Sequence, residues 1–180
     1  MPKVEVPFEE YVRETVAALT GSGRGVLLVS LDAAGRPNPM ALGWGALGYV
    51  WSNPTFMCLV RPSRYTYGCI EATGDFTVNL PYPEQQRAIT LCGTQSGREV
   101  DKFPACGFTP LDTGVVRSPG IAECGLTFAC RVVYYNDVQP GQMAPEVLSG
   151  AYPSGDFHRC YFGEILRTLA DEDFPARLGA

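Results

Sequence analysis

The chain has 180 residues, of which 46% are hydrophobic and 18% are charged, and its formal net charge is −5. A chain of this length and apolar content predicts one globular domain over residues 1–180 and excludes wholesale disorder. Its pI near 4.9 argues against a general nucleic-acid binder, because neutralising phosphates requires a basic surface. Arginine supplies all but two of the 14 basic residues, so clustered arginines are candidates for a planar anion-binding fork.

Neither a targeting segment nor a metal site is expected. Residues 1–10 carry acids and prolines rather than the apolar core of a signal peptide, and the longest apolar run, residues 41–51, is too short to cross a bilayer. The seven cysteines include no CxxC pair, and His158 is the single histidine. We therefore expect a cytoplasmic protein with reduced, mostly buried thiols and with neither a membrane nor a nucleic-acid partner.

The first half of the chain predicts a helix followed by antiparallel strands. Apolar residues recur at helical spacing over residues 8–19, and the glycines at 21 and 23 would end that helix. The apolar run at 25–31 predicts a buried strand, and 32–35 a hairpin turn. Further strands are expected at 36–45, 48–51, 55–60 and 76–80, a turn at Asn53-Pro54, helices at 64–72 and 84–91, and a loop at 93–97.

The second half predicts more strands than helices. Strands are expected at 126–135, 147–152 and 160–169, and the segment 136–145, which has two prolines, is expected to be a loop. Many short strands with few helices favour a mainly β fold, an antiparallel barrel with a few short peripheral helices. A β-sandwich is the alternative that local pattern leaves open.

The segment VRPSRYTY, at residues 60–67, combines the groups of a phosphate site at the end of a strand and the start of a helix. Two guanidiniums, hydroxyl groups and helix N-terminal amides all favour a bound anion. The residues concerned are Arg61, Ser63, Arg64, Tyr65 and Thr66. The alternative is an ordinary capped helix start with Ser63 as N-cap and solvated arginines.

The segment NPMALGW, at residues 38–44, predicts a strand against which a flat ligand could lie. Asn38 could hydrogen-bond the edge of a heterocycle, and Trp44 could stack against it. Alternatively, Met40, Leu42 and Trp44 alternate into the core.

Two further segments are weaker candidates. GTQSGREVDK, at residues 93–102, offers a tight turn with exposed amides followed by Lys102, one of only two lysines, although an ordinary surface loop would look the same. His158 precedes the last strand, and a lone histidine is more often structural than functional.

Read together, these segments resemble the flavin reductase-like, or flavoredoxin-like, family of FMN-binding split β-barrels. The matches also include FTVNLP at 76–81 and HRCYFGEI at 158–165, and they occur in the family's order along nearly the whole chain. The resemblance implies a single FMN-binding domain over 1–180 and an FMN held at the interface of a homodimer. Pro39, where a small residue such as Ala is usual, and Cys160, where Met is expected, depart from the family pattern.

The resemblance also implies roles for particular residues. The flavin ring would lie against Asn38, Met40, Ala41 and Trp44, and the phosphate would be held by Arg61, Ser63, Arg64 and Thr66. Tyr65 would lie beside the ribityl chain, while Asn79, Ser96, Gly97 and Lys102 would close the site from the side. His158 and Phe162 are candidates for contacting the substrate or the edge of the cofactor.

Flavin carries the hydride chemistry itself, so no catalytic side chain is expected. The main hypothesis is an FMN-dependent oxidoreductase that takes hydride from NAD(P)H and passes electrons to free flavin or another acceptor. An FMN-binding electron carrier reduced by a protein partner is the second, and a flavin-free binding module of the same fold is the third. The cysteines are expected to be dispensable for turnover, with Cys92, beside the 93–102 loop, the thiol to test first.

Overall fold

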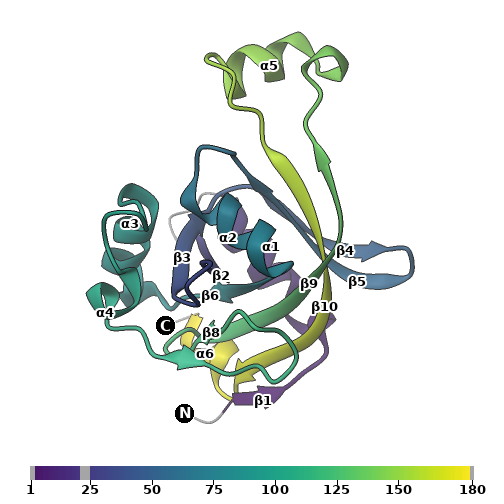
Figure 1. Ribbon diagram of the computed structural model, residues 1–180. Coiled ribbons are helices and arrows are strands. Elements are labelled where there is room, and N and C mark those ends of the chain that lie inside the picture. The colour runs from purple at the N-terminus through teal and green to yellow at the C-terminus, as the bar shows by residue number, and fades with distance from the viewer. Residues whose placement is uncertain (1–2, 21–24, 179–180) are drawn as a thin grey trace.

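The computed structural model of the protein describes residues 3–20 and 25–178. Short helices surround a curved antiparallel sheet (Figure 1). The strands are β1 (Lys3–Glu5), β2 (Val26–Leu31), β3 (Pro37–Leu42), β4 (Gly45–Val50), β5 (Asn53–Val60), β6 (Asp75–Leu80), β7 (Pro110–Leu111), β8 (Gly120–Ile121), β9 (Leu126–Asp137) and β10 (Arg159–Asp171). The α-helices are α1 (Val12–Leu19), α2 (Tyr65–Thr73), α3 (Gln86–Thr94), α4 (Lys102–Cys106), α5 (Pro145–Ala151) and α6 (Phe174–Leu178), and the 3-10 turns are η1 (Phe8–Tyr11), η2 (Pro83–Gln85) and η3 (Pro140–Gln142).

Strands β3 and β4 lie at the two ends of the main sheet although they are neighbours in the chain. The order is β3-β2-β6-β9-β10-β5-β4, with β1 also paired to β10, and every pair is antiparallel. Only Gly43 and Trp44 separate β3 from β4, so the sheet must curl until its ends approach. No ladder joins β3 to β4 within the described residues, so the barrel is split at this point. The predicted split β-barrel with peripheral helices is confirmed.

The side chains of β2 alternate between two apolar clusters, one inside the barrel and one outside it. Val26 and Leu28 face the barrel interior, where they join Phe56, Phe76 and Phe128 among others. Leu27 and Val29 face outward into a second cluster that includes side chains of α3 and α4. This period-two pattern holds α3 and α4 against the outside of β2 and β3, which places the segment between these two helices beside the split (Figure 1).

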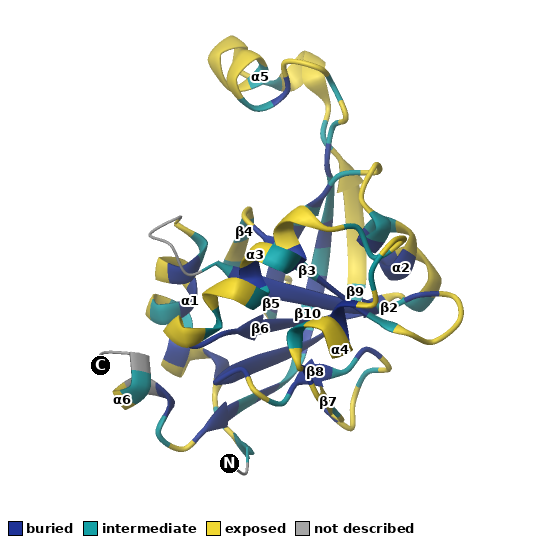
Figure 2. Ribbon diagram, turned by 90° about the vertical axis from the view of Figure 1, so that its left-hand side faces the viewer, coloured by how far each residue is buried: buried dark blue, intermediate teal, exposed yellow. Residues whose placement is uncertain are grey.

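Residues 138–158, which we refer to as the arm, project from the barrel on the ends of β9 and β10 (Figure 1). Most of the arm is exposed (Figure 2), and α5 has no buried residue. The predicted strand at 147–152 is wrong, because α5 occupies these residues. Pro145 stands in the first turn of α5, where its missing N–H costs nothing, and the described chain offers no neighbouring strand there. The predicted loop at 136–145 begins later, since β9 continues to Asp137.

Other boundaries differ more modestly. The turn between β4 and β5 lies at Trp51 and Ser52, which have positive φ angles of 50° and 63°, and not at Asn53-Pro54. The predicted helix at 8–19 is divided into η1 and α1, and the glycines expected to end it lie outside the described residues. The hairpin turn at 32–35 is confirmed by the bond from the Gly35 amide to the Asp32 carbonyl. Over the described ranges, no helix has the length and apolar character needed to span a membrane.

Candidate functional site

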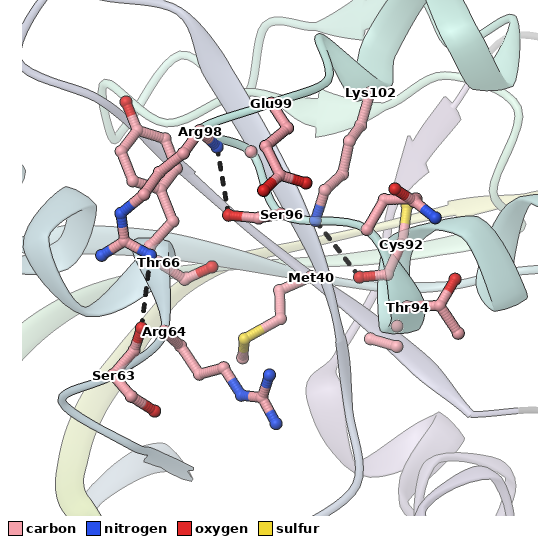
Figure 3. A pocket seen from close by; sticks show the side chains of 15 residues that line it. Met40, Ser63, Arg64, Thr66, Cys92, Thr94, Ser96, Arg98, Glu99 and Lys102 are labelled. Carbon is pink, nitrogen blue, oxygen red and sulfur yellow. Dashed lines mark hydrogen bonds between the residues drawn. The ribbon is translucent and has the colours of Figure 1, made fainter.

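A cavity of about 440 Å³ lies where β3, the start of α2 and the loop after α3 meet (Figure 3). We call it the cationic pocket; its walls are Met40, Ala41, Ser63, Arg64, Tyr65, Thr66, Cys92, Gly93, Thr94, Gln95, Ser96, Gly97, Arg98, Glu99 and Lys102. A second cavity of about 200 Å³ shares Met40, Ala41 and Arg64 with it and continues along the split to Trp44 and His158. The two cavities together form an elongated site with a cationic end and an aromatic end.

Lys102 is a buried cation with no anionic partner in the part of the chain that the structure describes. Its side chain begins in the first turn of α4, and the residue is only 4% exposed. Its Nζ donates to the carbonyl oxygens of Pro39 (3.0 Å) and Cys92 (3.2 Å), and no carboxylate of the described residues forms an ion pair with it. Burial lowers the pKa of Lys102, and the nearby charge of Arg64 acts in the same direction. Such a charge is costly when unpaired, so the pocket favours an anion.

Arg64 and the start of α2 add further donors to the same pocket. Arg64 is the N-cap residue of α2 and makes no side-chain capping bond, and its exposed guanidinium has no hydrogen-bond partner among the described residues. The Thr66 hydroxyl accepts a 2.8 Å bond from Asn38 Nδ2, which leaves its own proton available to an acceptor. The free amides at a helix N-terminus favour negative charge as well. These groups suit a phosphate.

Gly97 lets the loop approach β3 closely. A Cβ at this position would lie 2.0 Å from Asn38 Oδ1 and 2.7 Å from the Tyr65 ring. Asn38 itself is buried, and its Oδ1 has no hydrogen-bond partner in the described structure. The loop carrying Ser96 and Arg98 is therefore held over the start of α2 by the lack of a side chain at Gly97.

Arg61 and Ser63 are not free to bind a phosphate as predicted. The Arg61 guanidinium donates to the carbonyl oxygens of Ala151 (3.0 Å), Gly155 (3.2 Å) and Asp156 (2.9 Å), which end α5 and form the turn after it. The Ser63 hydroxyl donates to Asp156 Oδ2 at 2.5 Å. These carbonyls lack helical partners, so the arm satisfies them with Arg61. Both residues still line the cavities, but their polar groups fasten the arm to the barrel.

Three predicted residues do not line either cavity: Asn38, which lies behind Thr66, and Asn79 and Phe162, which lie farther away. Asn79 is fully buried between strands, where Nδ2 donates to the Leu27 carbonyl (3.2 Å) and Oδ1 accepts from the Ile121 amide (2.9 Å). Phe162 packs against Tyr134 with ring centroids 5.3 Å apart, on the part of β10 that faces the arm. Neither Asn79 nor Phe162 contributes to the site that this chain forms by itself.

Arg98 is a site residue that the sequence reasoning did not single out. Its guanidinium lies over the Tyr65 ring at 5.3 Å and donates to the Ser63 carbonyl at 3.3 Å, while its amide donates to Ser96 Oγ (Figure 3). An arginine directly after the Ser96-Gly97 turn was the available signal. With Arg64 and Lys102, it makes three cationic side chains around one cavity.

The second cavity ends at an aromatic wall. His158 lies 4.8 Å from Trp44 between ring centroids, and its Nδ1 is 2.8 Å from the Tyr152 hydroxyl. Burial, assisted by the charge of Arg61, lowers the pKa of His158 to about 4, so its imidazole is neutral at pH 7. Trp44 is 43% exposed, which makes its ring available to a flat ligand. This end of the site suits an uncharged aromatic system.

The arrangement matches a known family. A family model described as "Flavin reductase like domain" matches residues 19–177. The chain belongs to this family. The flavin reductase-like chain is 28% identical over 139 residues to an uncharacterised protein of Archaeoglobus fulgidus, an alignment that covers 77% of the chain and 68% of that relative.

Two solved structures show the same fold. A flavoredoxin from Methanosarcina acetivorans is 29% identical to the flavin reductase-like chain, with a TM-score of 0.65 over 83% of this chain and 69% of that one. An FMN-binding domain of a flavin reductases-like enzyme from Shewanella baltica OS155 is 20% identical, with a TM-score of 0.65 over 94% of this chain and 78% of that one. The resemblance stated from the sequence motifs is thereby confirmed.

Proposed function

We propose that the chain binds FMN, with the phosphate in the cationic pocket and the ring along β3 towards Trp44. The observation that carries this proposal is the buried Lys102 ammonium, which forms no ion pair among residues 3–20 and 25–178 and shares its pocket with an Arg64 guanidinium that is likewise unpaired there. A phosphate or the electron-rich edge of a flavin would supply that charge. The aromatic end of the site fits a flat ring, and the description of the Shewanella baltica neighbour as FMN-binding supports FMN in particular.

Bound FMN would supply two-electron chemistry by accepting a hydride and passing the electrons on. The side chains of the protein would stabilise charge on the cofactor and hold it in position. Lys102, held by the Pro39 and Cys92 carbonyls and only 4% exposed, stabilises added negative charge beside it. Thr66, oriented by Asn38, and Arg64 hold the anionic end, while neutral His158 and Trp44 keep the other end uncharged.

We propose that the activity is that of an oxidoreductase which takes hydride from NAD(P)H and reduces free flavin or another small acceptor. The second candidate is an electron carrier reduced by a protein, which the description of the Methanosarcina acetivorans neighbour as a flavoredoxin favours. Anaerobic mixing of the FMN-loaded protein with NADH or NADPH separates the two. Bleaching of the flavin absorption within seconds supports the enzyme, and an unchanged spectrum supports the carrier.

The cofactor proposal is tested on the protein as purified. We expect a flavin absorption spectrum, and heat-released cofactor that migrates with FMN on chromatography. Release of FAD, or failure of the protein to bind FMN after reconstitution, would overturn the proposal and leave the flavin-free binding module as the remaining hypothesis. This outcome does not depend on which electron donor is used.

We further propose a homodimer. Exposed aromatic residues gather near the tip of the β4–β5 hairpin and on the outer half of β9, where Trp51 and Tyr134 pack edge to face at 5.6 Å. Trp51 is 63% exposed, and exposed apolar patches of this kind mark association surfaces. Phe162 packs on the same cluster, so its predicted place at the cofactor edge requires the second copy. A cytoplasmic location remains a prediction.

A further inference from the structure

Two thiols meet where α3 packs against α4, and one of them lines the cationic pocket. Cys92 lies in the last turn of α3 and lines the pocket, and Cys106 is the last residue of α4. Their Sγ atoms are 3.8 Å apart. All seven cysteines lie in the described part of the chain, and no other two of them are joined by a hydrogen bond between their sulfurs. The closeness of these two is a tertiary feature, because they are 14 positions apart and belong to different helices.

The surroundings of Cys106 allow the two sulfurs to come closer. A disulfide has a sulfur–sulfur bond of about 2.05 Å, so the atoms must approach by about 1.8 Å. Cys106 is half-buried, and its neighbours Pro104, Ala105 and Gly107 are exposed at the end of a five-residue helix. Gly107 has φ +69°, a conformation that costs glycine little and ends α4 directly after the thiol. Because these three neighbours are exposed, the end of α4 can shift towards Cys92 without moving any of their side chains through the core.

We propose that Cys92 and Cys106 form a reversible disulfide, with a low-molecular-weight disulfide as the oxidant. The more accessible Cys106 attacks, as thiolate, one sulfur of the small disulfide, which forms a mixed disulfide and releases one small thiolate. The Cys92 thiolate then attacks the Cys106 sulfur and expels the second small thiolate. The protein loses two electrons to the small disulfide, and its two thiol protons pass to the released thiols.

Burial slows the oxidation of this pair of thiols. Burial raises the pKa of Cys92 to about 12 and also raises that of Cys106, while the positive charge of Lys102 opposes both shifts. Little thiolate therefore exists at neutral pH, and exchange is slow. The pair accordingly responds to sustained oxidising conditions rather than to brief ones.

The disulfide would close a loop that contains most of one wall of the pocket. Residues 93–105, between the two cysteines, include Gly97, which permits the close approach to β3, and Lys102, whose Nζ already binds the Cys92 carbonyl. Cross-linking α3 to α4 removes conformational freedom from this loop in the unfolded chain. The proposed modification thus stabilises the pocket wall in the position that the structure shows.

Peptide mapping of the wild-type protein tests the proposal directly. Native protein is equilibrated with mixtures of reduced and oxidised glutathione, free thiols are alkylated, and the digest is analysed by mass spectrometry. At the oxidising end we expect a peptide linking Cys92 to Cys106, reversed by dithiothreitol, and a melting temperature raised by roughly 6–12 °C for a loop of this size.

Matched variants distinguish the pair from general cysteine oxidation. Cys106→Ser should lose the linked peptide and the thermal shift, whereas Cys160→Ser, which removes another half-buried thiol, should keep both. Full alkylation of Cys92 and Cys106 at the most oxidising mixture would overturn the proposal, as would a linkage to any other cysteine. A stable glutathione adduct on Cys106 without the internal bond would overturn it equally.

Discussion

At the scale of single residues, Lys102 is a buried ammonium whose charge no carboxylate of the described residues neutralises. Two carbonyl oxygens satisfy part of its hydrogen-bonding capacity, but neither neutralises its charge. A buried charge of this kind lowers the stability of the protein alone and contributes to affinity when an anion arrives. Stability and binding should therefore respond to its removal in opposite directions.

Lys102→Met tests this opposition. The variant keeps the length of the side chain and removes the charge, so the FMN-free protein should unfold at an equal or higher temperature. Affinity for FMN should fall roughly ten- to hundred-fold, which corresponds to about 1.5–3 kcal/mol for hydrogen bonds to a charged group. Thermal unfolding with and without FMN measures both quantities. A variant that loses stability but keeps its affinity would remove Lys102 from the site.

Arg64→Ala should weaken FMN binding by a similar factor, because its guanidinium has no partner within the described chain. Arg13→Ala is the matched control, since Arg13 is an exposed arginine on α1 whose side chain is 93% accessible. Titration of each variant with FMN gives the two dissociation constants. Equal values would show that the phosphate lies elsewhere.

His158 gives a pH prediction with a definite sign. Its pKa is about 4 in the folded protein and about 6.5 when unfolded, so between these values the unfolded chain binds more protons. Stability should be fully present above about pH 6.5 and decline as the pH falls towards 4, by about 2–3 kcal/mol in total. His158 is the only histidine, so His158→Gln should flatten this part of a urea-denaturation pH profile. An unchanged profile would contradict the assignment.

At the scale of elements, the site depends on how closely a loop, a helix start and a strand approach one another. Gly97 sets the loop against Asn38 and Tyr65. Arg61 and Ser63 bind the arm to the segment that precedes α2. The same segment carries Arg64, so one stretch of chain contacts both the arm and the cationic pocket.

Two glycine-to-alanine substitutions test whether Gly97 is needed because a side chain there would clash, or only because glycine makes the backbone flexible. Gly97→Ala places a Cβ 2.0 Å from Asn38 Oδ1, so it should destabilise the protein by about 1–3 kcal/mol and weaken FMN binding. Gly68→Ala lies in α2 with no atom within 4 Å of the added Cβ, and it should stabilise the protein by about 0.5–1 kcal/mol. Urea denaturation of both variants gives the comparison. Equal effects would mean that the loop does not need the close approach.

At the scale of the whole molecule, the split places the site at an opening of the barrel and not inside its core. The interior is filled by aromatic and aliphatic side chains such as Phe56, Phe76 and Phe128. A ligand must therefore lie at the surface between β3 and the helices outside it. The exposed aromatic cluster with Trp51 and Tyr134 is a separate surface.

The proposed homodimer is tested by light scattering at micromolar concentration, where we expect twice the chain mass. Tyr134→Glu should shift the protein towards the monomer, because burying a carboxylate in an apolar contact is costly. Val115→Glu should leave the mass unchanged, because Val115 is an exposed apolar residue on the loop between β7 and β8 and not part of the aromatic cluster. A monomer mass for the wild-type protein would contradict the proposal.

Local sequence pattern was sufficient wherever the physical cause was local. The alternation and β-branching of residues 126–135 and 160–169, and the turn residues at 32–35, predicted strands and a hairpin that the structure contains. Arg64, Thr66, Ser96 and Lys102 line one cavity, but local pattern marked them only as separate candidates, and the resemblance to the family was what implied a shared site. The strand expected at 147–152 is wrong because a short partly apolar segment needs a neighbouring strand to pair with, and the described arm provides none.

What the sequence by itself determined is therefore the main strands of the barrel, its fold class and most of the candidate groups for an anion, but not α4, α5 or the short strands β7 and β8. Tertiary structure alone decided which of those groups are free. Arg61 and Arg64 look equivalent in the sequence, yet the first is bound by three carbonyls of a distant arm and the second has no partner in the described chain. The same holds for Cys92 and Cys106, whose contact follows from the packing of two helices. Local sequence pattern indicates which groups a residue can bind, but only the folded structure shows which of its hydrogen-bonding groups are already paired.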